Sequence, residues 1–164
     1  MFPRRPGRIQ GFDYLGFHRY SVTICTHSRQ SIFVDRAAIE SVLTSIRQCA
    51  AASRFAVLAY CFMPDHLHLL VAGAEEHADF QRFMATWKQR AGYRHKQRTR
   101  QALWQESYYD HVLRDVEEVM RAVRYVLENP VRKGLVRRFD EYPFSGSDVY
   151  SNDQLREFWQ GRQG

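Results

Sequence analysis

The stretch from Cys61 to Val71 reads CFMPDHLHLLV, and the rest of the chain is organised around it. Hydrophobic residues flank two histidines, His66 and His68, which a single leucine separates; this is typical of a buried strand rather than a loop. Because side chains alternate between the two faces of a strand, both imidazoles lie on the same face. Two imidazoles at this spacing can bind one divalent cation. The alternative is a pair of histidines hydrogen-bonded in a polar cleft, and the pair alone does not decide between the two.

Length and composition indicate one globular domain. The chain has 164 residues, of which 45% are hydrophobic and 26% charged. Its 24 Lys and Arg residues exceed its 18 Asp and Glu residues, which favours a polyanionic partner. No apolar run approaches the roughly 18 residues of a transmembrane helix. The three cysteines are far apart in apolar patterns, so we expect reduced thiols in a cytoplasmic protein that does not associate with a membrane.

Strand and helix patterns alternate on both sides of the histidine pair. A β-branched alternating run predicts a strand over 20–26, and apolar residues at helical spacing after Asp35 predict a helix to about residue 52. Predicted strands over 55–62 and 66–71 flank a turn at 63–65, which implies an antiparallel hairpin. The order is completed by a second helix with a buried stripe from Phe80 to Ala91, a strand over 103–113, and a third helix that Asp115 caps and Pro130 ends.

This β-α-β-β-α-β-α order predicts the α+β class. The specific expectation is a ferredoxin-like or RRM-like split β-α-β fold, with a four-stranded antiparallel sheet, helices on one face and the histidine pair on a central strand. We divide the chain into a basic N-terminal arm (1–18), a catalytic domain (19–145) and a C-terminal tail (146–164). The tail has a helical pattern near residues 153–159.

The third predicted helix carries a tyrosine on an unexpected face. Its apolar stripe consists of Val116, Val119, Met120, Val123 and Leu127. At about 100° per residue, Tyr125 lies roughly opposite the centre of that stripe, and Asn129 follows it one turn later. Tyr125 is therefore either an ordinary surface tyrosine or a phenol directed at a substrate with an amide beside it.

Two basic segments are candidates for binding a nucleic-acid backbone. The first is the N-terminal arm with Arg4, Arg5 and Arg8. The second is a run without acidic residues that contains Lys88, Arg90, Arg94, Lys96, Arg98 and Arg100. Basic side chains interleaved with aromatic ones suit a phosphodiester backbone and its bases. The alternatives are a disordered tail and a solvated helix face.

These features fit one chemistry. A tyrosine phenol is a poor nucleophile when protonated, but it can attack phosphorus when the target is activated. A Mg²⁺ or Mn²⁺ ion polarises a scissile phosphate and stabilises the charge that develops on it. Neutral imidazoles and an amide oxygen would leave most of the ion's charge, and several coordination positions, available to the phosphate.

Three sequence blocks in this order resemble a known family. The stretch YCFMPDHLHLLV (60–71) is similar to the His-hydrophobic-His motif of the HUH single-strand endonucleases. The stretches YYDHVLRD (108–115) and RYVLENPVRKGLV (124–136) resemble the REP-associated tyrosine transposases, a bacterial branch of the single-tyrosine insertion-sequence transposases. The resemblance covers roughly residues 17–145.

The resemblance implies a role for each matching residue. Tyr125 would be the nucleophile, His66 and His68 would bind Mg²⁺ or Mn²⁺, and Asn129 would be the third protein ligand, where related insertion-sequence enzymes often use a glutamine. The implied substrate is single-stranded DNA folded into REP or BIME hairpins. Cleavage would leave a 5′-phosphotyrosine and a free 3′-OH that can rejoin strands. The protein would act as a monomer or a homodimer.

Two other functions compete with this interpretation. A metal-dependent hydrolase with an HxH motif on a barrel needs about 250 residues and a further ligand cluster, both of which this chain lacks. A non-catalytic single-stranded nucleic-acid-binding module of RRM-like fold would grip RNA by aromatic stacking. The predicted first strand lacks the aromatic pair for that mode, and the histidines would then have no role.

Overall fold

A computed structural model describes residues 9–160 of the protein. Its strands and helices follow one another as β1 (Arg19–Thr26), α1 (Arg36–Ser53), β2 (Phe55–Met63), β3 (His66–Gly73), α2 (Phe80–Thr99), β4 (Trp104–Leu113), α3 (Val116–Arg132), β5 (Ser145–Gly146) and α4 (Asn152–Gln160). Short 3₁₀ turns occur at η1 (His27–Arg29), η2 (Ile32–Val34) and η3 (Phe139–Glu141). The predicted α+β order and the helix in the C-terminal tail are confirmed. No helix among the described residues is long and apolar enough to cross a membrane.

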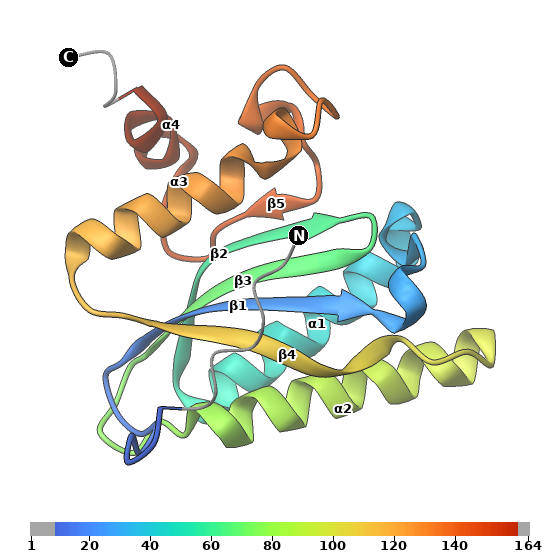
Figure 1. The fold of residues 1–164 in the computed structure, drawn as a ribbon, viewed down its shortest axis with the longest axis horizontal. Helices are drawn as coiled ribbons and strands as arrows, with labels where there is room; N and C mark the ends of the chain where they lie inside the picture. The colour runs from blue at the N-terminus through green and yellow to red at the C-terminus, as the bar shows by residue number, and fades with distance from the viewer. Residues whose placement is uncertain (1–8, 161–164) are drawn as a thin grey trace.

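The strands form one antiparallel sheet in the order β4-β1-β3-β2-β5 (Figure 1). The first four positions are those of the predicted split β-α-β fold, and β3 with its histidines is central. The sheet has five strands rather than the predicted four, because the two-residue strand β5 pairs with the outer edge of β2. That pairing is too short to leave a strand pattern in the sequence.

Helices cover both faces of the sheet, which corrects the prediction that they cover one (Figure 1). α1 and α2 pack on the face that carries Leu67, Leu69 and Val71, whereas α3 and α4 belong to a second cluster with Leu70 and Cys61. A strand with one solvated face alternates, but nearly every residue of β3 is buried. Continuous burial is the pattern of a strand that is covered on both sides.

Asp115 caps the start of α3 as predicted, but the end of the helix does not follow the prediction. Asp115 Oδ1 accepts a hydrogen bond from the Glu118 N–H at 2.8 Å. Pro130 lies inside the last turn, and the helix continues to Arg132. A proline removes only one hydrogen bond, so near a helix end it does not by itself stop the helix. The predicted stripe is also shifted, because Val126 is buried while Val116 and Met120 are 63% and 43% exposed.

The hydrophobic core begins upstream of residue 19. Tyr14 is buried and stacks against Tyr20 and Phe80, with ring centroids 6.2 and 6.0 Å away. The part of the predicted arm with Arg4, Arg5 and Arg8 lies outside the described residues. The buried stripe that was predicted for the second helix, Phe80 to Ala91, is confirmed.

Candidate active site

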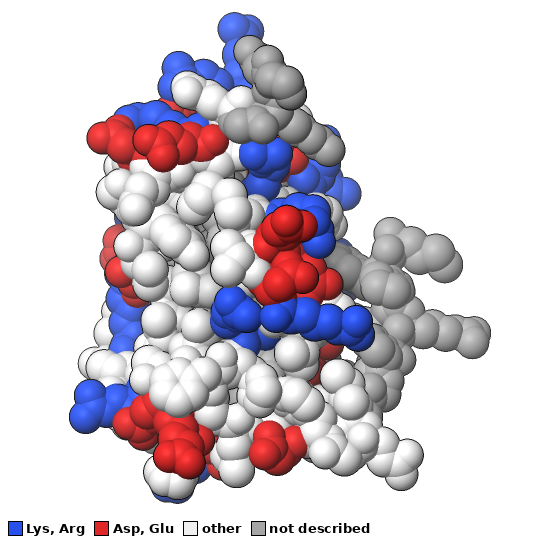
Figure 2. Space-filling view, turned by 90° about the vertical axis from the view of Figure 1, so that its left-hand side faces the viewer, with Lys and Arg blue, Asp and Glu red and all other residues white. Residues whose placement is uncertain are grey.

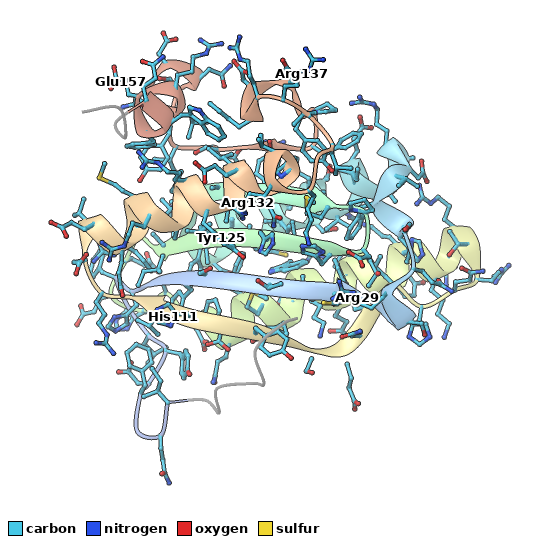
Figure 3. All side chains as sticks on the ribbon, turned by 45° about the horizontal axis from the view of Figure 1, so that its top comes forward. Arg29, His111, Tyr125, Arg132, Arg137 and Glu157 are labelled. Carbon is cyan, nitrogen blue, oxygen red and sulfur yellow. The ribbon has the colours of Figure 1, made fainter. Side chains whose placement is uncertain are left out.

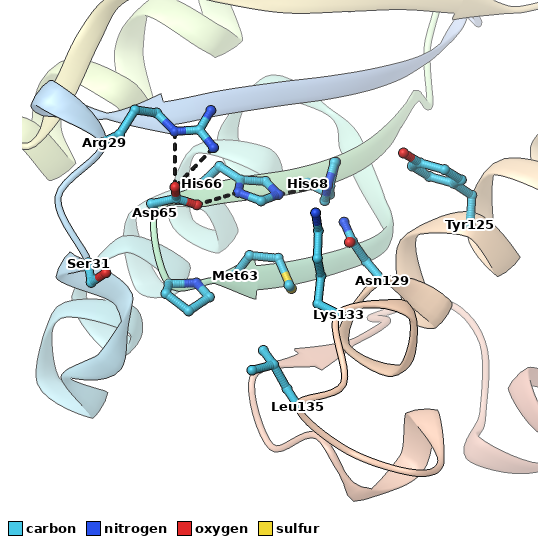
Figure 4. A pocket seen from close by; sticks show the side chains of 11 residues that line it. Arg29, Ser31, Met63, Asp65, His66, His68, Tyr125, Asn129, Lys133 and Leu135 are labelled. Carbon is cyan, nitrogen blue, oxygen red and sulfur yellow. Dashed lines mark hydrogen bonds and ion pairs between the residues drawn. The ribbon is translucent and has the colours of Figure 1, made fainter. Parts of the chain in front are cut away.

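The two histidines face each other on β3. The Nε2 atoms of His66 and His68 are 3.1 Å apart, and the planes of the rings are nearly perpendicular (Figure 4). The strand register places His68 opposite Thr23 on β1, whose Oγ1 lies 3.1 Å from His68 Nδ1. On the other side of the pair, His66 Nδ1 lies 2.7 Å from the Asp65 carboxylate. Each ring is therefore held at Nδ1, and each directs Nε2 toward its neighbour.

The contacts at Nδ1 determine which nitrogen of each ring carries a lone pair. A carboxylate accepts but cannot donate, so His66 donates its Nδ1–H to Asp65 and keeps a lone pair on Nε2. Thr23 can accept in the same way from His68 Nδ1–H. Asp65 is itself held by Arg29, whose Nε and Nη2 lie 3.0 and 2.9 Å from Oδ2. Partners of this kind fix the tautomer and orientation of metal-binding histidines.

Burial keeps both imidazoles neutral. It lowers the pKa of His68 to about 3, with smaller contributions from the nearby charges of His66 and Arg132. Burial also lowers the pKa of His66, although the Asp65 carboxylate opposes that shift. Burial disfavours ionisation of Asp65, but the hydrogen bonds from His66 and Arg29 outweigh it, and the pKa of that carboxyl lies below its ordinary value. Near neutral pH the pair consists of uncharged nitrogen donors beside a charged carboxylate.

Helix α3 provides the opposite wall of the site. Tyr125, Asn129 and Lys133 follow one another at intervals of four residues, so they lie along one side of the helix. Figure 3 shows Tyr125 extending from α3 over the strands. Its ring centroid is 6.0 Å from that of His68. Tyr125 is 57% exposed, whereas Asn129 is only 4% exposed and points into the site (Figure 4).

These side chains line one cavity of about 490 Å³ (Figure 4). The structure brings four sequence-predicted site residues together here: Tyr125, His66, His68 and Asn129. The remaining lining residues are Arg29, Ser31, Met63, Pro64, Asp65, Lys133 and Leu135. The cavity opens beside the exposed phenol, so a polymeric substrate can reach it from the surface.

The donor set fits one metal ion that keeps open positions. Residues 9–160 contain no group of three or more His, Cys, Asp and Glu side chains that could hold a metal. The available donors are the two Nε2 atoms and the Asn129 amide oxygen, which would leave the other positions to water or phosphate oxygens. Imidazole nitrogen matches Mg²⁺ less well than oxygen does.

The predicted DNA-binding run is not beside this cavity. Lys88, Arg90, Arg94, Lys96 and Arg98 lie on α2, with Arg100 directly after it, on the sheet face opposite the histidines. Three of these side chains contact other protein groups: Lys88 donates to the Glu106 carbonyl, Arg94 to Ser45 Oγ, and Arg98 pairs with Asp35. On the face seen in Figure 2, basic side chains lie beside acidic ones rather than in one continuous patch.

Sequence reasoning missed three cations near the site. Arg29 and Lys133 line the cavity, and the Arg132 guanidinium carbon lies 4.2 Å from the centroid of the Tyr125 ring. The four-residue spacing from Tyr125 through Asn129 was a signal that could have identified Lys133. Arg29 left no local signal, because the pairing of β1 with β3 brings it to Asp65 across 36 positions of the chain.

Comparison with known proteins gives a consistent family. A family model described as "Transposase IS200 like" matches residues 17–129. A putative REP-associated tyrosine transposase of Haemophilus influenzae is 26% identical, over 60% of this chain and 66% of the relative. The REP-associated tyrosine transposase of Escherichia coli K12 is also 26% identical, over 56% and 53%. The matches span about two thirds and about half of the lengths of these relatives.

Solved structures share the fold. A REP-associated tyrosine transposase bound to a REP hairpin superposes with a TM-score of 0.73 at 18% identity, over 94% of this chain and 87% of that one. A putative transposase from Deinococcus radiodurans gives a TM-score of 0.51 at 24% identity, over 74% and 97%. The resemblance that the three sequence blocks indicated is confirmed.

Proposed function

Because the chain belongs to the IS200-like transposase family, we propose that it is a metal-dependent single-strand DNA endonuclease and strand transferase that acts through a phosphotyrosine. The observation that carries the proposal is the single cavity in which the Tyr125 ring, on α3, lies 6.0 Å from the His68 ring, on β3. An accessible phenol beside two neutral imidazoles and an amide suits nucleophilic attack on an activated phosphate.

Each residue of the cavity has a role in this chemistry. A bound Mg²⁺ or Mn²⁺ would withdraw charge from the scissile phosphate, and His66, His68 and Asn129 would hold it. The Tyr125 oxygen attacks phosphorus and loses its proton to water, while the bond from phosphorus to the 3′-oxygen breaks. The products are a 5′-phosphotyrosine and a 3′-OH. Because one phosphodiester replaces another, the 3′-OH can reverse the step and rejoin strands without ATP.

The proposed substrate is a DNA hairpin of the REP type with a single-stranded flank. A solved protein of the same fold is bound to a REP hairpin, and both curated relatives are named for REP association. The nucleophile and the histidine pair come from the same chain in one cavity. This supports a site assembled within a monomer over one shared between the subunits of a homodimer.

A covalent-capture experiment tests the proposal. The protein is incubated with Mn²⁺ and a labelled pool of hairpin oligonucleotides whose single-stranded flanks are randomised. A labelled band that survives a denaturing gel is the expected phosphotyrosine adduct, and sequencing the captured DNA maps the cleaved position. The Tyr125→Phe variant and excess EDTA should each abolish the band. Hairpin binding without any adduct from the wild-type protein would favour the RRM-like binding module instead.

A further inference from the structure

We propose that Lys133 is a catalytic residue of this cavity whose ammonium group binds a non-bridging oxygen of the scissile phosphate. The inference rests on the proposed function and deepens it, because it adds a protein cation to the neutral metal ligands and the phenol, whereas Arg29, the other cation that lines the cavity, is paired with Asp65. Lys133 is the residue directly after α3, follows Asn129 by four residues and lines the cavity with both histidines. Figure 4 shows its amine directed at the space between Asn129 and the histidine pair.

The backbone that carries Lys133 is fixed by the end of the helix. Lys133 is the C-cap of α3, and its N–H donates to the Asn129 carbonyl at 3.0 Å. The next residue, Gly134, has φ +71°, and its N–H donates to Val131. The Leu135 N–H reaches back to the Pro130 carbonyl at 2.9 Å. These two bonds are those of a Schellman motif, in which glycine takes the left-handed position without strain. The lysine is therefore presented from a defined helix end rather than from a variable loop.

Charge pairing in the cavity leaves Lys133 as an uncompensated cation. Arg29 contacts Asp65 at 2.9 Å, and the nearby Arg132 contacts Glu128 at 3.4 Å. No carboxylate lies within ion-pair distance of Lys133 in the part of the chain that the structure describes, residues 9–160. Burial lowers the pKa of His66, and the positive charge of Lys133 contributes to that shift. With neutral imidazoles beside it, the ammonium group attracts an anion into the cavity.

A lysine at this position should weaken metal binding in the free protein but stabilise the attacked phosphate in the DNA-bound protein. Without DNA, the ammonium repels a divalent cation held by the histidines. With DNA, a phosphate between the two cations attracts both, and its charge grows as Tyr125 attacks. Lys133 takes no part in the proton transfers: the phenol proton leaves to water, and the departing 3′-oxygen takes a proton from water. A merely structural lysine would have neither effect.

The test measures these opposite signs with Lys133→Met. In the absence of DNA, Mn²⁺ affinity followed by electron paramagnetic resonance should rise about fivefold as the repulsion is removed. The second assay uses a hairpin that the covalent-capture experiment has identified as a substrate. On it, the rate of adduct formation by Lys133→Met should be about 100-fold below that of the wild type, as when one oxyanion-stabilising group is removed. Lys133→Arg keeps the charge and should stay near the wild type in both assays. Arg121→Gln removes one exposed charge from the first half of α3 and is the matched control.

A change in the substrate locates the contact. Replacing the mapped scissile phosphate by a methylphosphonate removes the negative charge that Lys133 would bind. On this substrate the rate of adduct formation by Lys133→Met should be less than about tenfold below that of the wild type. The methylphosphonate has already removed the charge that Lys133 would bind. Equal losses on both substrates, or weaker Mn²⁺ binding by Lys133→Met, would overturn the role of Lys133. If the wild type forms no adduct, the proposed function itself is wrong. If the wild type and Lys133→Met form the adduct equally fast, the proposed role of Lys133 is wrong but the proposed function is not.

Discussion

Lowering the pH from 7.5 to 5.5 should destabilise the metal-free protein through His68. Burial sets the pKa of His68 at about 3 in the folded protein, whereas an unfolded histidine has a pKa of about 6.5. Below pH 6.5 the unfolded chain therefore binds a proton that the folded chain does not bind until the pH approaches 3. The unfolded state is favoured by that difference, so stability is highest above pH 6.5 and falls as the pH falls.

The size of the effect follows from the linkage. Each pH unit below the pKa of the unfolded histidine lowers the free energy of unfolding by about 1.4 kcal/mol. Between pH 7.5 and 5.5, His68 should therefore lower the free energy of unfolding by roughly 1.4 kcal/mol. His66 acts in the same direction, because burial lowers its pKa as well. Urea unfolding in EDTA at the two pH values measures the loss. His68→Gln should reduce it by about 1.4 kcal/mol, whereas His27→Gln, at an exposed position, should leave it unchanged.

Two results would refute this reasoning. The first is an equal pH-dependent loss of stability in the wild type and His68→Gln. The second is titration of the His68 imidazole between pH 7.5 and 5.5 in an NMR experiment on the folded wild type. The NMR measurement remains decisive if His68→Gln does not fold.

Three further predictions concern the site and the basic helix. Tyr125→Phe should abolish the covalent adduct and leave hairpin affinity within about twofold in a gel-shift titration, because the ring is exposed and its loss of one oxygen removes no core packing; adduct from the variant would identify another nucleophile. Asp65→Asn should weaken Mn²⁺ binding about tenfold in the paramagnetic resonance assay, since the carboxylate fixes the His66 tautomer; unchanged affinity would contradict that role. Neutralising Arg94, Lys96 and Arg98 together should weaken binding to all single strands equally. It should also reduce the slope of the logarithm of the binding constant against that of the salt concentration by roughly 0.7 per lost phosphate contact; an unchanged slope would leave α2 as a solvated face.

The histidine pair and the tyrosine were predictable because each left a periodic signal. The alternation of residues 66–71 places both imidazoles on one face of a strand, and Tyr125 departs from the apolar stripe of its helix. The structure shifts that stripe toward Val126, which is buried, whereas Val116, the first residue of the helix, is 63% exposed. The tyrosine remains beside the histidines despite this error, because Tyr125 lies at the edge of the buried side rather than opposite it.

The end of α3 shows where a local rule is too coarse. Pro130 predicted a stop after Asn129, but the helix continues to Arg132 and is ended by the left-handed Gly134. The missing N–H and the clash of the ring both concern the turn before a proline, whereas its fixed φ is itself helical, so the residues after Pro130 can continue the helix. The extra residues matter for function, because they extend the line of Tyr125 and Asn129 by one turn to Lys133.

The layer arrangement was in principle contained in the chain order. In the observed sheet order, β1 and β2 run parallel with one strand between them, as do β3 and β4. Right-handed connections through α1 and α2 then place both helices on the same face. Leu67, Leu69 and Val71 on β3 supply the larger apolar surface that two helices need, so the histidines must lie on the other face, under α3. The basic run on α2 consequently cannot line the cavity. If it binds DNA, it does so around the edge of the sheet, at a distance from the phosphate that Tyr125 attacks.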